Sequence, residues 1–304
     1  MVAAALPCKV ALRGRARLFP TKEARPRGRA LGGTFLTRAG LKLRRSWVAA
    51  GAFAAVVGAP AGAFGGAWTL PQGSGQLIAT LYGWTGFGPP WGGNPPVSQS
   101  RVDAQTYVQY GLTDSLTIFG QTALEHYALG DPTPNTYNGL DYSDVGLRAK
   151  LWSTGDWVFS GEATGFIAGA RDPNAPAQEG NTGWAGEARL NAGTNFRLGA
   201  IPGFIDAEVA YRLRTAGPPD EWHGDLTVGF KFTPRLMLML QDFTTVSSPS
   251  TDATFSEWRQ SVVEASVVYA LDDKWSLQLG LFSTVWTVKT NTQHGVALAV
   301  WRSF

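Results

Sequence analysis

The sequence predicts an all-β chain that folds as a transmembrane up-and-down antiparallel β-barrel of about twelve strands. Segments of about ten residues alternate between apolar and polar side chains with a period of two, as strands with unlike faces do. The connections between these segments alternate in length along the chain. The last segment, 296–304, alternates to its end and closes on Phe304. Such a final strand is expected where a barrel must leave no unpaired edge in lipid.

Charge divides the chain into a basic leader and an acidic remainder. Residues 1–46 carry 12 Lys or Arg against one acid, whereas the rest carries 14 basic and 22 acidic side chains. Nucleic-acid binding by the acidic part is not expected, because phosphates need a basic face.

The leader contains the pattern of a secretory signal. Lys42, Arg44 and Arg45 precede an apolar run, 48–57, that is too short to span a bilayer, and an Ala-Gly-Ala cleavage site follows at 61–63. We therefore expect an N-terminal extension at 1–41, which an early start codon would explain, a signal peptide at 42–63 and a barrel at 64–304. An Arg-rich transit peptide is the alternative interpretation. The single cysteine, Cys8, lies in the extension.

Twelve segments are expected to be strands, and the clearest of them is 101–111. There Arg101, Asp103 and Gln105 share one face, while Val102, Ala104 and Val108 share the other. The expected strands are 76–86, 101–111, 116–125, 144–151, 157–164, 187–196, 205–214, 225–232, 236–243, 258–269, 275–281 and 296–304.

Short and long connections alternate between these strands. The short ones are 112–114, 152–156, 197–203, 233–235 and 270–273. The longer ones, rich in Gly, Pro, Asn and Asp, are 87–100, 126–139, 169–183, 215–221, 244–257 and 285–293. Bacterial outer-membrane barrels have short periplasmic turns and long outer loops, so both termini are expected on the periplasmic side.

Aromatic residues flank both sets of connections, as the girdles of a membrane barrel do. Those beside the short turns are Tyr110, Trp152, Trp157, Phe196, Phe204, Phe232, Tyr269, Trp275 and Phe304. Those beside the longer loops are Trp84, Trp184, Trp222, Trp258 and Trp286.

A secreted soluble barrel or sandwich shows the same periodicity, with its apolar face turned inward. Three features favour the membrane instead. The strands are long for a soluble sheet, where about 5–6 residues is usual. Aromatic residues stand at both ends of the strands, and the last strand ends in Phe304.

In a membrane barrel the charged faces line the interior. The predicted basic residues there are Arg101, Arg148, Lys150, Arg189, Arg212, Arg214 and Lys231. The predicted acidic ones are Asp103, Glu125, Asp144, Glu162, Glu187, Asp206, Glu208, Asp225 and Glu264. Because buried charges must be paired or hydrated, we expect an inner lattice of salt bridges. The nearest approach to a selective site is Arg212 with Arg214 opposite Arg189, which could attract anions.

No catalytic or metal site is expected. A serine nucleophile needs a base within hydrogen-bonding reach, and none of the three histidines, His126, His223 and His294, has a serine two residues later. His223 and Asp225 could share a face, but no nucleophile accompanies them. The His and Asp spacing gives no metal-ligand set, and no cofactor is expected.

Two stretches besides the final strand carry a family resemblance. Residues 67–76 and the hairpin 107–116, together with the strand ending at Phe304, resemble Gram-negative outer-membrane transporter barrels, including those of the phenol-degradation (MetA-pathway) family. Arg302 departs from the usual hydrophobic residue at its position. The resemblance implies an outer-membrane location among lipid and lipopolysaccharide, and insertion by the barrel-assembly machinery through the last strand. It supplies no catalytic residues.

The sequence thus predicts a passive outer-membrane channel or transporter for small solutes, with apolar and aromatic solutes as candidates. A structural or surface-interaction barrel with a closed lumen is the alternative. A membrane-embedded hydrolase is a third hypothesis, with His223 as its candidate residue.

Overall fold

The computed structural model describes residues 66–89, 96–131, 134–167, 169, 183–215, 218–249 and 257–304. The predicted extension and signal peptide lie outside these residues. The described part of the chain is all-β, and none of it forms a helix long and apolar enough to span a membrane. Its strands are β1 (Gly75–Gly88), β2 (Val97–Thr113), β3 (Leu116–Leu129), β4 (Asn135–Leu140), β5 (Ser143–Thr154), β6 (Trp157–Ile167), β7 (Ala185–Leu198), β8 (Ile201–Arg214), β9 (Glu221–Lys231), β10 (Leu236–Ser247), β11 (Arg259–Ala270), β12 (Trp275–Val288) and β13 (Thr292–Ser303).

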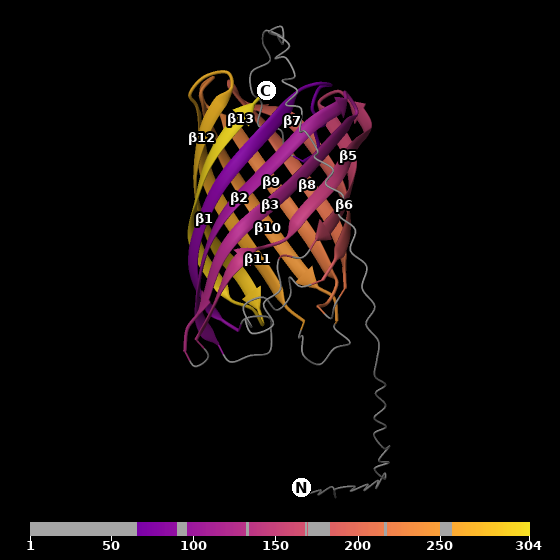
Figure 1. Ribbon diagram of the computed structural model, residues 1–304. Helices are drawn as coiled ribbons and strands as arrows, with labels where there is room; N and C mark the ends of the chain where they lie inside the picture. Colours follow the sequence, from indigo (N-terminus) through magenta and orange to yellow (C-terminus); the bar gives the residue numbers. More distant parts are fainter. Residues whose placement is uncertain are drawn as a thin grey trace, which may run out of the picture. The chain divides into compact units, whose positions relative to one another are not determined.

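The strands form one antiparallel sheet that closes on itself (Figure 1). Closure joins β1 to β13, where Gly75 and Phe304 exchange backbone hydrogen bonds of 2.7 and 2.9 Å. β3 pairs with β5 through 116–121 and with β4 through 124–129, so β4 and β5 act as one strand interrupted at Asp141 and Tyr142. The barrel therefore has the predicted twelve strands across its wall.

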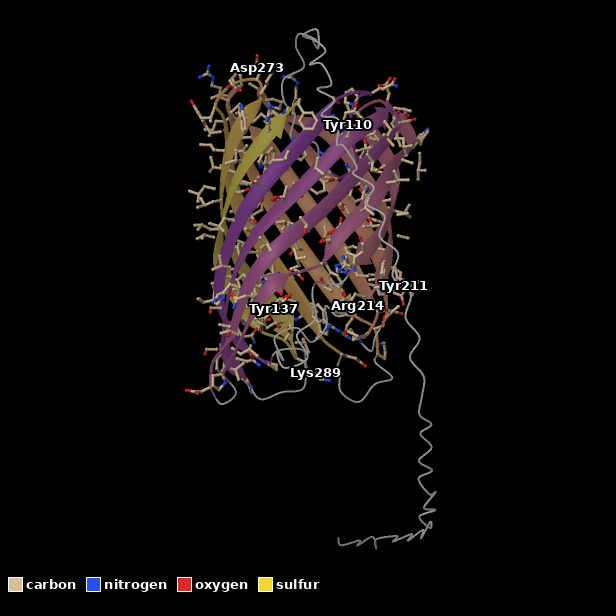
Figure 2. All side chains as sticks on the ribbon, viewed as in Figure 1. Tyr110, Tyr137, Tyr211, Arg214, Asp273 and Lys289 are labelled. Atoms are coloured by element: carbon tan, nitrogen blue, oxygen red, sulfur yellow. The ribbon has the colours of Figure 1, made fainter. Side chains whose placement is uncertain are left out.

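The two ends of the barrel differ in their connections. At one end, called here the short-turn end, the connections are 114–115, 155–156, 199–200, 232–235 and 271–274. Gly155 and Gly199 occupy the left-handed region there, with φ of 55° and 62°, which tight two-residue hairpin turns require. The other end is called the long-loop end. Figure 2 shows Tyr110 and Asp273 at the short-turn end and Tyr137 and Lys289 toward the long-loop end.

Strands extend further toward the long-loop end than the sequence predicts. The expected loop 285–293 is mostly strand, because β12 continues to Val288 and β13 begins at Thr292. The expected loop 126–139 contains the end of β3 and all but the last residue of β4. The bounds expected for the loops 87–100 and 244–257 were wrong in the same way. These strand ends mix apolar residues with Thr, Asn, Gln and His, so backbone pairing continues after the clean alternation has stopped.

Side-chain exposure shows which face points outward. Leu190 and Leu281 are 61% and 62% exposed, although each lies in the middle of a paired strand. Inward residues are instead polar and buried, as Thr117 and Asp206 show at 0% and 1% exposure. An apolar outer wall around a polar interior is the arrangement of a barrel that has hydrocarbon outside and water inside.

The apolar wall has the height of a bilayer core. Outward Trp222 on β9 and Phe232, directly after β9, stand ten residues apart and are 52% and 48% exposed. At about 3.3 Å per residue and a tilt of about 40°, they are separated by about 25 Å along the barrel axis. This is the height expected of the lipid-facing band.

Two aromatic residues predicted for the outer girdles lie inside the barrel. Phe204 is 5% exposed and packs in an inner apolar cluster with Met237 and Met239, and Trp84 packs against an inner cluster that contains Tyr127. Both predictions were wrong because each residue is an even number of positions from inward neighbours on its strand. The predicted girdle residues Tyr110, Trp157, Phe232, Tyr269, Trp275 and Phe304 are 38–54% exposed.

Candidate functional site

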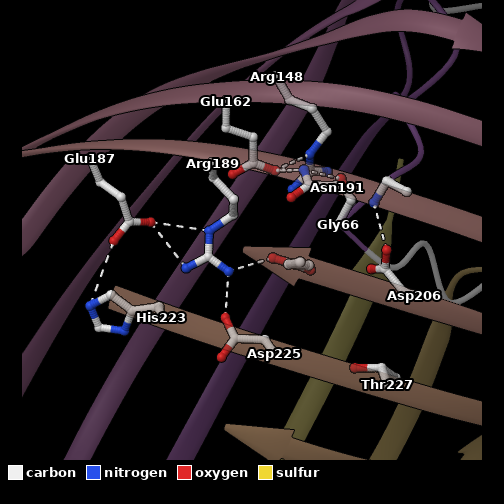
Figure 3. Close-up of polar contacts among 12 residues, drawn as sticks. Gly66, Arg148, Glu162, Glu187, Arg189, Asn191, Asp206, His223, Asp225 and Thr227 are labelled. Atoms are coloured by element: carbon white, nitrogen blue, oxygen red, sulfur yellow. Dashed lines mark hydrogen bonds and ion pairs between the residues drawn. The ribbon is translucent and has the colours of Figure 1, made fainter. Parts of the chain in front are cut away.

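The barrel interior holds a dense set of ion pairs centred on Arg189 (Figure 3). Arg189 Nη2 lies 3.0 Å from Glu187 Oε1, and Arg189 Nη1 lies 2.5 Å from Glu208 Oε2 and also pairs with Asp225. These residues come from the neighbouring strands β7, β8 and β9, whose inward side chains converge because their registers place the pairs side by side. One guanidinium therefore holds together three adjacent strands.

Arg212 and Arg214 are neutralised rather than free to attract anions. Arg212 Nη2 lies 2.8 Å from Glu187 Oε2, and the guanidinium stacks on the Phe166 ring at 4.1 Å. Arg214 pairs with Glu221, whose second oxygen lies 3.3 Å from His223 Nε2. The three arginines share their carboxylates with one another, so the predicted anion-attracting group is part of the inner lattice of salt bridges.

Chain residues 66–71, which precede β1, lie inside the barrel toward the short-turn end and are called here the lumen segment. The Ala67 backbone N–H donates to Asp206 Oδ1 at 3.1 Å, and the Leu70 N–H donates to Thr117 Oγ1 at 2.8 Å. Asn191 donates to the Gly66 carbonyl at 3.0 Å, as Figure 3 shows. These partners come from β3, β7 and β8, so the segment is attached to several parts of the wall at once.

Arg148 connects the lumen segment to the ion-pair lattice. Its Nε lies 2.6 Å from Glu162 Oε1, and its Nη1 donates to the Trp68 carbonyl at 3.3 Å. Asn191 donates to the same Glu162 oxygen at 2.8 Å. The segment thus completes hydrogen bonding for side chains that are almost fully buried, at 6% exposure for Arg148 and 3% for Asn191.

Trp68 anchors the segment by packing. Its ring meets the Phe204 ring edge-on, with centroids 6.1 Å apart, within the inner apolar cluster of β8 and β10. A Cβ at Gly193 would lie 2.5 Å from the Trp68 ring, so the wall of β7 is hollowed where the indole sits. Glycine is required there by this close approach.

A separate ionic group lies toward the long-loop end. Arg101 contacts Asp103, Glu125 and Asp141 at 2.7, 3.2 and 2.7 Å. It is one cation among three carboxylates, and it lies beside a cavity of about 390 Å³ in the long-loop half of the lumen.

The other predicted interior residues are less strongly tied. Asp144 and Lys231 are half-buried on inward faces, whereas Glu264 is 5% exposed and accepts a hydrogen bond of 3.2 Å from Gln278. Lys150 lies at the short-turn end and donates to the Asp114 carbonyl at 3.1 Å. Among the described residues, no group of three or more His, Cys, Asp or Glu is arranged to hold a metal ion.

Sequence reasoning missed several members of this interior. Glu221 falls in the expected loop 215–221, although its even spacing from Asp225 along β9 marks the inward face. Asp141 lies at the break between β4 and β5, where no periodicity identifies it. The lumen segment is too short for any periodic signal. The two additional acids make the interior more acidic than predicted.

The histidines occupy unlike positions. His223 belongs to the ion-pair lattice, whereas His126 and His294 lie on the outer wall. His294 Nδ1 lies 2.8 Å from Ser283 Oγ on the neighbouring strand. A serine two positions after a histidine on the same strand is not the pattern here, because Ser283 and His294 face each other across neighbouring strands.

Comparison with solved structures places the fold among bacterial outer-membrane barrels. The COG4313 outer membrane channel from Pseudomonas putida F1 is similar with a TM-score of 0.63, at 14% identity over 79% of this chain and 98% of that one. The β domain of the Bordetella autotransporter BrkA gives 0.51, at 12% identity over 77% of this chain and 100% of that one. No protein-family model matches the chain, and no curated protein matches it.

Proposed function

We propose that the protein is a passive channel for small solutes in the bacterial outer membrane, closed in this structure by the lumen segment. A polar interior enclosed by an apolar wall suits a water-filled path across a membrane. The observation that carries the proposal is the binding of residues 66–71 across the interior, through Thr117, Asn191 and Asp206.

The attachment of the segment also suggests how the channel opens. The segment is held by hydrogen bonds and by Trp68, with no strand pairing of its own. Its withdrawal would expose Arg148, Asn191 and Asp206 to water, which can replace the lost hydrogen bonds. The barrel wall itself needs no rearrangement for this step.

The orientation follows from the same proposal. β1 starts and β13 ends at the short-turn end. Short turns face the periplasm in bacterial outer-membrane barrels. The lumen segment would then close the periplasmic side of the channel. The resemblance of this chain to the phenol-degradation family of barrels stays a prediction.

Single-channel recording in planar bilayers tests the proposal. We expect the intact barrel to be mostly silent and a variant lacking residues 66–70 to give stable open steps. A folded but silent deletion variant would contradict the proposal, and would favour a structural or surface-interaction barrel with a lumen closed by its own salt bridges.

A second candidate, an ester hydrolase on the outer wall, is favoured by the contact between Ser283 and His294. A base within hydrogen-bonding distance can activate a serine hydroxyl. The test is fatty-acid release from phospholipid in mixed micelles. Activity lost in both Ser283→Ala and His294→Ala, and kept in His223→Ala, would support it, whereas an inactive wild-type protein would remove it.

A further inference from the structure

The cavity in the long-loop half of the lumen is lined by both charged and aromatic residues. Its volume of about 390 Å³ is in the range of small-molecule sites. Its lining includes Arg101, Asp103 and Asp141, and also Glu264 and aromatic rings from β1, β10 and β12. It is distinct from the lumen segment, none of whose residues lines it.

Negative charge dominates this cavity. Arg101 is the cation among its lining residues, and two lining carboxylates, Asp103 and Asp141, are already within 2.7 Å of it. Glu125 contacts the same guanidinium at 3.2 Å. Among the described residues, Asp103 and Glu125 alone carry more negative charge than Arg101 carries positive charge, unlike the arginine-rich lattice around Arg189, Arg212 and Arg214.

Glu264 adds a carboxylate that no cation of the described residues neutralises. It is 5% exposed, and within the described residues no Lys, Arg or His lies within ion-pair distance of it. Its Oε1 accepts a hydrogen bond from the Gln278 side-chain amide at 3.2 Å. A Cβ at Gly280 would lie only 2.3 Å from the same oxygen. A buried carboxylate without a cation is costly unless something pairs with it.

Aromatic rings line the same space. Tyr82 and Phe282 meet edge-on with centroids 6.2 Å apart, and Trp84 lies on the same strand as Tyr82. Phe243 is 40% exposed although it shares the inward face of β10 with the buried Met237 and Met239. Aromatic faces attract cations, and exposed rings gain from contact with an apolar body.

We propose that this cavity binds a small organic cation, with its ammonium group at Glu264 and its apolar or aromatic body against Tyr82, Phe243 and Phe282. A neutral aromatic molecule would leave Glu264 unpaired, and an anion would meet the excess carboxylates. The inference deepens the proposed channel function by naming the class of solute, and it rests on that function for the solute's passage.

Calorimetric titration of the barrel, purified in detergent after expression of the full chain, tests the inference with benzyltrimethylammonium as the probe. Benzyl alcohol and benzoate serve as the neutral and anionic controls, and empty micelles correct for partitioning. We expect saturable binding of the cation alone. Equal binding of benzyl alcohol, or no binding of the cation, would overturn the inference.

Variants locate the site. Glu264→Gln is expected to weaken cation binding at least about tenfold, because it removes a charge-assisted contact. Phe282→Leu, which keeps an apolar side chain but removes a ring face, should weaken it about two- to tenfold. The exposed Glu257→Gln is the matched control and should bind as wild type does. Unchanged binding in both cavity variants would overturn the assignment.

Conductance separates this inference from the channel proposal. Binding of the cation by a barrel that stays silent without residues 66–70 would keep the site and refute the channel. Open steps in the deletion variant without cation binding by the intact barrel would keep the channel and refute the site.

Discussion

The contact between Leu70 and Thr117 gives the sharpest perturbation of the closed state. The Leu70 N–H donates to Thr117 Oγ1 at 2.8 Å, and Thr117 is 0% exposed. Thr117→Val keeps the shape of the side chain and removes its acceptor. The Leu70 N–H then has no partner at Thr117 while the segment is bound, but it meets water once the segment has left.

The size of the effect follows from that difference. A buried donor left without a partner costs about 1–3 kcal/mol. The closed state carries this cost and the open state does not, so the open-to-closed ratio should rise about 5- to 150-fold, at about 1.4 kcal/mol per tenfold change.

The assay is the fraction of time that single channels are open in planar bilayers. Thr106→Val is the matched control, because Thr106 lies exposed on the outward face of β2, between Gln105 and Tyr107 on the inward face. An open fraction in Thr117→Val no greater than in wild type and Thr106→Val would refute the role of this hydrogen bond in closure.

Three further outcomes are expected. Arg189→Met leaves Glu187, Glu208 and Asp225 without their shared cation and should destabilise the barrel by about 3–5 kcal/mol, measured by unfolding in detergent, whereas an unchanged midpoint would show that the lattice is dispensable. Leu279→Arg on the outer wall should cost about 2–4 kcal/mol in lipid vesicles, and normal stability there would contradict a lipid-facing position for Leu279, which is 54% exposed. In the turn before β12, backbone N–H groups of Lys274 and Trp275 hydrogen-bond to Asp272 and lower the pKa of its carboxyl below the usual 3.8. Because the folded state favours the ionised form, wild type should be more stable than Asp272→Ala at neutral pH. This difference in stability should vanish as pH falls through the lowered pKa. A difference that persists at the most acid pH would argue against the turn hydrogen bonds.

The faces of the strands were predictable because period-two alternation is local. The alternation of neighbouring residues is enough to assign Asp103 and Val102 to opposite faces of the strand. The count of twelve strands follows from the repetition of that pattern along the chain. Strand ends were less predictable, since β12 continues to Val288 past an irregularity in its pairing with β11, and β13 begins at Thr292. Apolar alternation marks the lipid-facing band and not the full length of a paired strand.

The partners inside the barrel were not predictable from one sequence. Arg189 reaches Asp225 across β8, and Arg148 meets the Trp68 carbonyl 80 positions away in the chain. Such contacts depend on strand register and on the closure of the wall, neither of which the local pattern determines. The lumen segment was missed for the same reason: its hydrogen-bond partners exist only once the barrel has formed.

A barrel in a membrane requires apolar side chains to face lipid and polar side chains to face the interior. Nitroxide labels on single cysteines at Leu279 and Gln105, introduced into a Cys8→Ala chain in lipid vesicles, measure this through collisions with oxygen and with a water-soluble nickel chelate. We expect the label at Leu279 to collide with oxygen and to be shielded from the chelate, and the label at Gln105 to show the lower oxygen access of the two. A label at Leu279 that meets the nickel chelate more readily than oxygen would contradict the membrane barrel and the channel derived from it.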